Sequence, residues 1–175
     1  MPAFVFGLPL HPLVVHAVVV LVPLALLTGI AIAVWPAARR RYGWPVVFLA
    51  VLATLSIPVA TSSGEELRDR LPENALIHTH AELGDQLLAF VAPMTIALAA
   101  LVLLDRFRTA RADGPGTTIA PAARWTRPAA VALAAVAVAL AAVSAVQVVR
   151  IGDSGARAVW HNTKYVAPTH HGDDD

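Results

Sequence analysis

The chain has 175 residues, of which 57% are hydrophobic and 14% charged, and its formal net charge is +1. This composition is too apolar for a water-soluble globular protein of the same length and predicts an integral membrane protein. The small net charge gives no reason to expect nucleic-acid binding. The absence of cysteine excludes disulfides, thiolate metal ligands and covalent c-type haem attachment by this chain.

Four apolar runs follow one another along the chain, and we expect each to cross the bilayer as a helix. About 20 apolar residues span the hydrocarbon core, and each run contains a stretch of that length without Asp, Glu, Lys or Arg. The runs are continuous rather than alternating, which favours helices over strands. The expected fold is an all-α antiparallel four-helix bundle at residues 1–166, with spans near 12–38, 43–63, 76–106 and 128–161, followed by a disordered tail at 167–175.

Arginines between the spans predict the orientation of the bundle. They lie between spans one and two and between spans three and four: Arg39, Arg40, Arg41, Arg106, Arg108, Arg111, Arg124 and Arg127. Basic residues in short loops mark the cytoplasmic side. We therefore expect both termini and the loop between spans two and three on the extracytoplasmic side of a bacterial cytoplasmic (inner) membrane, with the chain as a multi-pass protein of that bilayer.

This topology gathers most of the histidines, and several acids, at the outer end of the bundle. The chain has seven histidines, and the predicted cluster contains His11, His16, His78, His80 and His161 with Glu82 and Asp85. Ionisable side chains at membrane depth are costly and usually functional. The cluster therefore predicts a binding site at this end.

Two kinds of cofactor suit such a cluster. A b-type haem takes two neutral imidazoles from different helices, each oriented by a hydrogen-bond acceptor. A zinc, copper or iron ion takes two or three histidines with a carboxylate. We expect His16 and His80 to be the principal ligands of either group, with further ligands drawn from His11, His78, His161, Glu82 and Asp85. Such a centre would serve electron transfer or the assembly of a redox complex.

Two alternatives use the same residues without a cofactor. The histidines and acids can form an interhelical hydrogen-bond network in an accessory or scaffold subunit. Alternatively, His16, Glu65, Asp85 and Arg150 can act as the proton relay of a small transporter. No G-x-S-x-G or H-E-x-x-H motif and no Gly-rich phosphate loop occurs in the chain, so no hydrolase or nucleotide-binding class is predicted.

Three segments resemble a known family: Leu10–His16, His80–Gly84 and Ile151–Trp160. They are similar to the marks of a bacterial integral-membrane family called domain of unknown function 2231, and the resemblance covers nearly the whole chain. It implies a four-span protein in a membrane electron-transfer setting, because some members are fused or adjacent to Rieske or cytochrome modules. The positions that match the family are His11, His16, His80, Gly152, Gly155 and Trp160.

Overall fold

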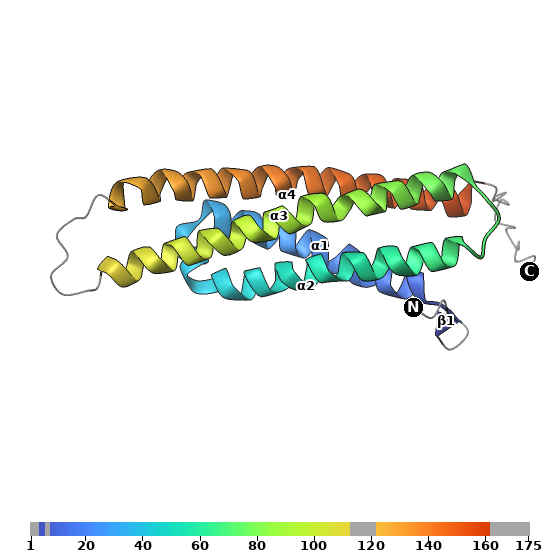
Figure 1. Ribbon diagram of the computed structural model, residues 1–175, viewed down its shortest axis with the longest axis horizontal. Helices are drawn as coiled ribbons and strands as arrows, with labels where there is room; N and C mark the ends of the chain where they lie inside the picture. The colour runs from blue at the N-terminus through green and yellow to red at the C-terminus, as the bar shows by residue number, and fades with distance from the viewer. Residues whose placement is uncertain (1–3, 6–7, 113–121, 162–175) are drawn as a thin grey trace, which may run out of the picture.

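The protein is a bundle of four long helices with a short hairpin before the first. The computed structural model describes residues 4–5, 8–112 and 122–161. The two-residue strands β1 (Phe4–Val5) and β2 (Leu8–Pro9) pair antiparallel. They lead into α1 (Leu10–Val34), α2 (Pro36–Arg68), α3 (Ala75–Ala112) and α4 (Ala122–Trp160), as Figure 1 shows. The predicted all-α four-helix bundle is confirmed, and the small hairpin is an addition to it.

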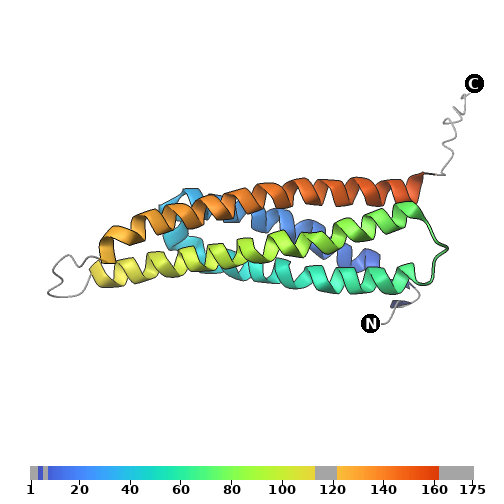
Figure 2. The same ribbon diagram turned by 45° about the horizontal axis from the view of Figure 1, so that its top comes forward.

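Each helix of the bundle packs mainly against two neighbours. Helices α1 and α3 each pack against α2 and α4, and they lie diagonally opposite each other with few direct contacts. Figures 1 and 2 show the four helices running along one axis, with the α1–α2 turn at one end and the α2–α3 connection at the other. We call the end that holds His11 and His80 the histidine end, and the end that holds Arg39 and Arg108 the arginine end.

The surface of the bundle is that of a membrane protein. All four helices are long and apolar enough to cross a bilayer. Less than half of the most apolar part of each helix is buried inside the bundle, and large aliphatic side chains such as Leu27, Ile96 and Val149 are exposed. Contact with water over so much apolar surface would be strongly unfavourable. The chain is therefore a multi-pass membrane protein whose outer faces contact lipid.

The helices differ in extent from the predicted spans. Helix α1 ends at Val34, not near residue 38, because Pro36 restricts the residue before it to extended backbone. Trp35 has φ −116° and ψ 98°, and Pro36 opens α2, where its missing N–H costs nothing. The three arginines expected in a loop therefore belong to the first turns of α2. Helices α3 and α4 also extend beyond their predicted spans, to Ala112 and back to Ala122.

Small residues let the helices approach closely in the core. A Cβ added at Gly29 of α1 would lie 2.9 Å from Leu98 Cδ1 of α3, and one at Gly43 of α2 would lie 2.9 Å from Val102 Cγ2. Leu98 is fully buried. Van der Waals contact between backbones is a main source of helix association in lipid, where helices gain little from the hydrophobic effect.

A buried ion pair joins three helices at the arginine end. Arg39 Nη1 of α2 donates to the carbonyls of Ile32 (3.1 Å) and Ala33 (3.2 Å), in the last turn of α1. Arg39 Nη2 lies 3.6 Å from Asp105 Oδ1 of α3, and the two side chains are only 7% and 12% exposed. Carbonyls at a helix C-terminus have no partner within the helix. Arg39 therefore caps α1 while it ties α2 to α3.

We expect Asp105→Ala to lower the free energy of unfolding by about 3 kcal/mol, because it leaves a buried guanidinium without a countercharge. Unfolding of the purified protein in mixed detergent micelles measures this. The control is Asp69→Ala, which removes a carboxylate whose side chain is 76% exposed and lies 4.0 Å from Arg68; this change should cost less than about 1 kcal/mol. Equal effects of the two substitutions would contradict a structural role for the buried pair.

Candidate functional site

Two histidines face each other at the histidine end, each held by a neighbouring helix. His11, in the first turn of α1, has its Nδ1 3.0 Å from the Ala60 carbonyl and 3.3 Å from Ser63 Oγ, both on α2. His80, near the start of α3, has its Nδ1 3.1 Å from the Ile151 carbonyl and 3.2 Å from Ser154 Oγ, both on α4. Each imidazole therefore links the two helices of one hairpin.

The two hairpins repeat one local arrangement. Ser63 Oγ donates to the Ala60 carbonyl at 2.8 Å, and Ser154 Oγ donates to the Ile151 carbonyl at 2.9 Å. In both cases the serine lies three residues after the carbonyl that the histidine contacts. Because α1 and α3 run in the same direction and lie diagonally opposite, the hairpins α1–α2 and α3–α4 are related by an approximate two-fold axis along the bundle. The repeat sets the two histidines on either side of this axis.

A glycine after each serine gives room for the imidazole. A Cβ at Gly64 would lie 2.9 Å from Cε1 of His11, and one at Gly155 would lie 3.0 Å from Cε1 of His80. Both distances are shorter than a normal carbon–carbon contact. The Ser-Gly pair thus supplies both the hydrogen-bond acceptor and the space that each ring needs.

The hydrogen bonds determine which ring nitrogens are protonated. A carbonyl oxygen only accepts, so each neutral ring must carry its proton on Nδ1 and leave an unprotonated lone pair on Nε2. Within the described residues, no donor contacts either Nε2. The ring centroids lie 6.4 Å apart with the planes at 79° to each other. The site therefore holds two half-buried imidazoles, close together, with one acceptor nitrogen each.

This geometry is compatible with two imidazoles that share one metal. Metal–imidazole bonds of about 2.0–2.1 Å place the centroids of two opposed rings roughly 6 Å apart, close to the observed separation. Metal-ligating histidines usually donate their other N–H to a carbonyl, as both rings do here. In the described part of the chain, no three His, Asp or Glu residues form a metal-sized group. The protein would supply two ligands and leave the other positions open.

The pairing differs from the one expected from sequence, because His80 meets His11 and not His16. His16 is exposed, and its Nδ1 contacts the Pro12 carbonyl of its own helix at 2.5 Å. Five residues correspond to a rotation of roughly 140° around an α-helix. With His11 directed at the bundle axis, His16 must point away from it.

The remaining predicted ligands also lie outside the pair. His78 is exposed and sits 3.4 Å from Glu82 on the outer face of α3. Asp85 and His161 are exposed as well. The structure therefore does not gather these four residues around the two imidazoles.

Among the described residues, those of the predicted proton relay do not bond to the histidine pair. The ion pairs at the histidine end do not bond to it either. Three of these groups are exposed: Glu65, Asp85 and Arg150. Asp153 and Arg157 lie four residues apart on α4 and form an exposed ion pair at 3.0 Å. No hydrogen bond or ion pair between described residues connects these groups to His11 or His80, so the structure offers no continuous relay through the pair.

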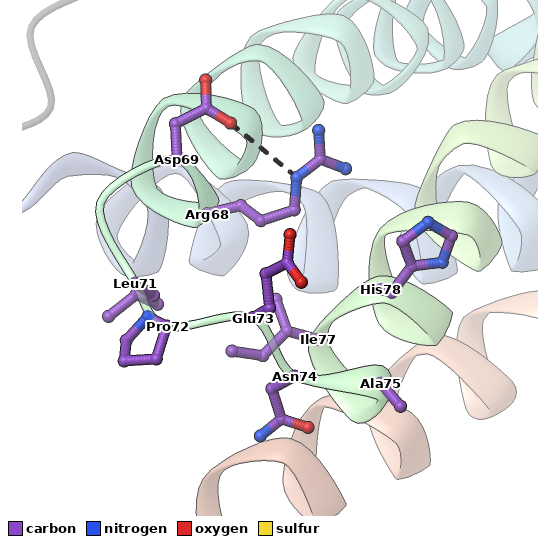
Figure 3. Close-up of a pocket in the computed structure, with 9 residues that line it drawn as sticks. All are labelled: Arg68, Asp69, Leu71, Pro72, Glu73, Asn74, Ala75, Ile77 and His78. Atoms are coloured by element: carbon purple, nitrogen blue, oxygen red, sulfur yellow. Dashed lines mark ion pairs between the residues drawn. The ribbon is translucent and has the colours of Figure 1, made fainter.

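A surface pocket of 660 Å³ lies beside the site, along the α2–α3 connection. Figure 3 shows its lining, which includes the exposed Arg68–Asp69 ion pair and His78. Neither histidine of the pair lines it. The pocket is a hollow of the connecting loop, and the paired imidazoles form a separate site.

Sequence reasoning missed Ser63, Gly64 and Ser154, which hold the rings in place. The signal that can reveal them is an internal repeat: a histidine near the start of the first and third helices, and a Ser-Gly dipeptide near the end of the second and fourth. Antiparallel topology brings these four segments to the same end. The repeat therefore indicates contacts between histidines and Ser-Gly pairs at that end, but it does not select which histidine of each helix makes them.

A family model described as a predicted membrane protein (DUF2231) matches residues 7–168. The match spans the four helices and includes both histidines with their Ser-Gly partners. It confirms the resemblance noted in the sequence. No curated protein and no solved structure is found to match the chain.

We expect Gly64→Ala and Gly155→Ala each to destabilise the protein by about 1–3 kcal/mol, because the added methyl group displaces a hydrogen-bonded ring. Thermal unfolding in detergent measures the effect. Gly84→Ala and Gly152→Ala are matched controls, since a Cβ at either position meets nothing within 4 Å. These controls should be neutral or stabilising by about 0.5–1 kcal/mol, as alanine is the better helix former. Similar losses at all four glycines would contradict the ring-packing role.

Proposed function

The chain belongs to the DUF2231 family of predicted membrane proteins, and we propose that it binds a transition-metal centre through His11 and His80. The centre is the iron of a b-type haem or a bare zinc, copper or iron ion. The observation that supports this most directly is the pair of rings 6.4 Å apart, each with its Nδ1 occupied by a backbone carbonyl. Both Nε2 atoms thereby remain available to bind a metal.

Electrostatics favours a cation at this position. The two neutral imidazoles lie 6.4 Å apart between centroids, and each has an Nε2 lone pair that accepts no hydrogen bond from a described residue. A metal ion accepts both lone pairs at once, and the carbonyls at Nδ1 increase the basicity of the ligating nitrogens. The Ser-Gly contacts hold the rings before the metal binds, so less ordering is needed on binding. Each part of the repeated arrangement therefore contributes to metal affinity.

Electron transfer, or the assembly of a redox complex, is the function that such a centre would serve. When bound, haem iron, copper or non-haem iron supplies one-electron chemistry. The residues of this chain bind and orient the centre: His11 and His80 as ligands, Ser63 and Ser154 as acceptors behind them. Because both histidines lie near the start of a membrane-spanning helix, a partner at the membrane surface can approach closely. A Rieske or cytochrome-type partner in the bacterial cytoplasmic membrane fits the redox modules that the family resemblance implies.

Absorbance and metal analysis of the purified protein test this proposal. We expect protein isolated from membranes in mild detergent to carry a haem spectrum or about one transition-metal ion per chain. His11→Ala and His80→Ala should each abolish that species, because either change removes one of two ligands. His16→Ala and His78→Ala should retain it, since both side chains are exposed and directed away from the pair. A wild-type protein without haem or metal in its native membrane, or full occupancy in both pair variants, would overturn the proposal.

A second candidate function follows from one specific observation: each histidine already joins two helices through its Nδ1 hydrogen bonds. We propose as the alternative a cofactor-free scaffold subunit in which the imidazoles stabilise the bundle through hydrogen bonds between helices. His11→Gln and His80→Gln separate the two functions, because a glutamine amide can donate to the same carbonyl but is a poor metal ligand. Retained stability with lost metal supports the metal centre. Retained stability of a wild-type protein that never held metal supports the scaffold.

A further inference from the structure

A second polar site lies at the arginine end, far along the bundle from the histidines. A pocket of 370 Å³ opens between the start of α2 and the end of α3, lined by Pro36, Arg39, Arg40, Asp105, Arg108 and Thr109. We propose that this pocket binds the phosphate group of an anionic phospholipid. The inference does not depend on the proposed metal centre.

The charge of the pocket favours an anion. Its lining holds three arginines and one aspartate, and that aspartate is paired with Arg39. The formal balance is therefore three positive charges minus one negative charge, or +2. Arg40 and Arg108 form no ion pair with any described residue. Their guanidinium groups suit the oxygens of a phosphate, which they can contact through two hydrogen bonds.

One buried donor of a lining residue also lacks an acceptor. The Arg39 Nε–H is buried without a partner among the described residues, although Nη1 donates to two carbonyls and Nη2 is paired with Asp105. Helix α2 begins at Pro36 with no acidic residue in its first turn, and the side chain of Trp35 makes no capping hydrogen bond. The N–H groups of Ala37 and Ala38 therefore have no side-chain cap from Trp35. A helix N-terminus in this state attracts phosphate through its N–H groups and dipole.

The position of the pocket identifies a lipid as the source of the phosphate. Exposed aromatic side chains surround the start of α2: Trp35 (62%), Tyr42 (51%) and Trp44 (45%). Tryptophan and tyrosine concentrate at the depth of the lipid headgroups. The pocket therefore lies where phospholipid phosphates are abundant. Basic pockets between membrane helices bind anionic headgroups by this combination of charge and depth.

Thermal stability and native mass spectrometry of the detergent-purified protein test the assignment. We expect phosphatidylglycerol to raise the unfolding temperature and to remain bound as a lipid adduct, with little effect of phosphatidylcholine. The double variant Arg40→Gln/Arg108→Gln should lose the adduct and most of the stabilisation. The matched control is Arg150→Gln/Arg157→Gln, which removes the same charge from exposed positions at the histidine end; it should behave as the wild type.

Three outcomes would overturn the assignment. Equal stabilisation by phosphatidylcholine would exclude recognition of the anionic headgroup. An equal loss in the control variant would show that binding follows overall charge and not the pocket. If inorganic phosphate at millimolar concentration displaces the lipid and stabilises the protein to the same extent, the site takes free phosphate and not a lipid.

Discussion

The hydrogen bonds that His11 and His80 donate to backbone carbonyls of neighbouring helices are the interaction on which the rest of the site depends. In each case a carbonyl oxygen and a serine hydroxyl oxygen both lie within hydrogen-bond distance of Nδ1, so the ring N–H has two oxygen acceptors on the neighbouring helix. In an apolar surrounding such a contact is worth more than in water, because neither partner has solvent as an alternative. These two contacts set the tautomer of each ring, its orientation and the chemistry of its other nitrogen.

The structural repeat explains why the two rings meet. Each hairpin of helices brings a histidine at the start of one helix against a Ser-Gly pair at the end of the next. Stacking two such hairpins side by side around an axis places equivalent residues across it. The paired site is therefore a consequence of symmetry, since one local contact made twice generates a two-ligand arrangement that neither hairpin has alone.

The two ends of the bundle use the backbone in a similar way for different purposes. At the arginine end, Arg39 donates to carbonyls that α1 leaves free at its C-terminus, and Asp105 balances its charge. At the histidine end, neutral imidazoles donate to carbonyls within helices. One end thereby concentrates positive charge next to a helix N-terminus, and the other presents uncharged acceptor nitrogens. The first arrangement suits an anion and the second a metal cation.

The sequence by itself determined the four membrane helices, the family and the end of the bundle at which histidines gather, because these depend on hydropathy, length and the order of antiparallel spans. It did not determine which histidines meet. His11 and His16 lie in the same short segment, and only the rotation of α1 about its own axis directs one inward and the other to the surface. That rotation is set by packing against α2 and α4, which no local pattern in α1 encodes. The role of Gly64 and Gly155 was likewise decided by tertiary structure, since the space that each provides is filled by a ring more than fifty residues away along the chain.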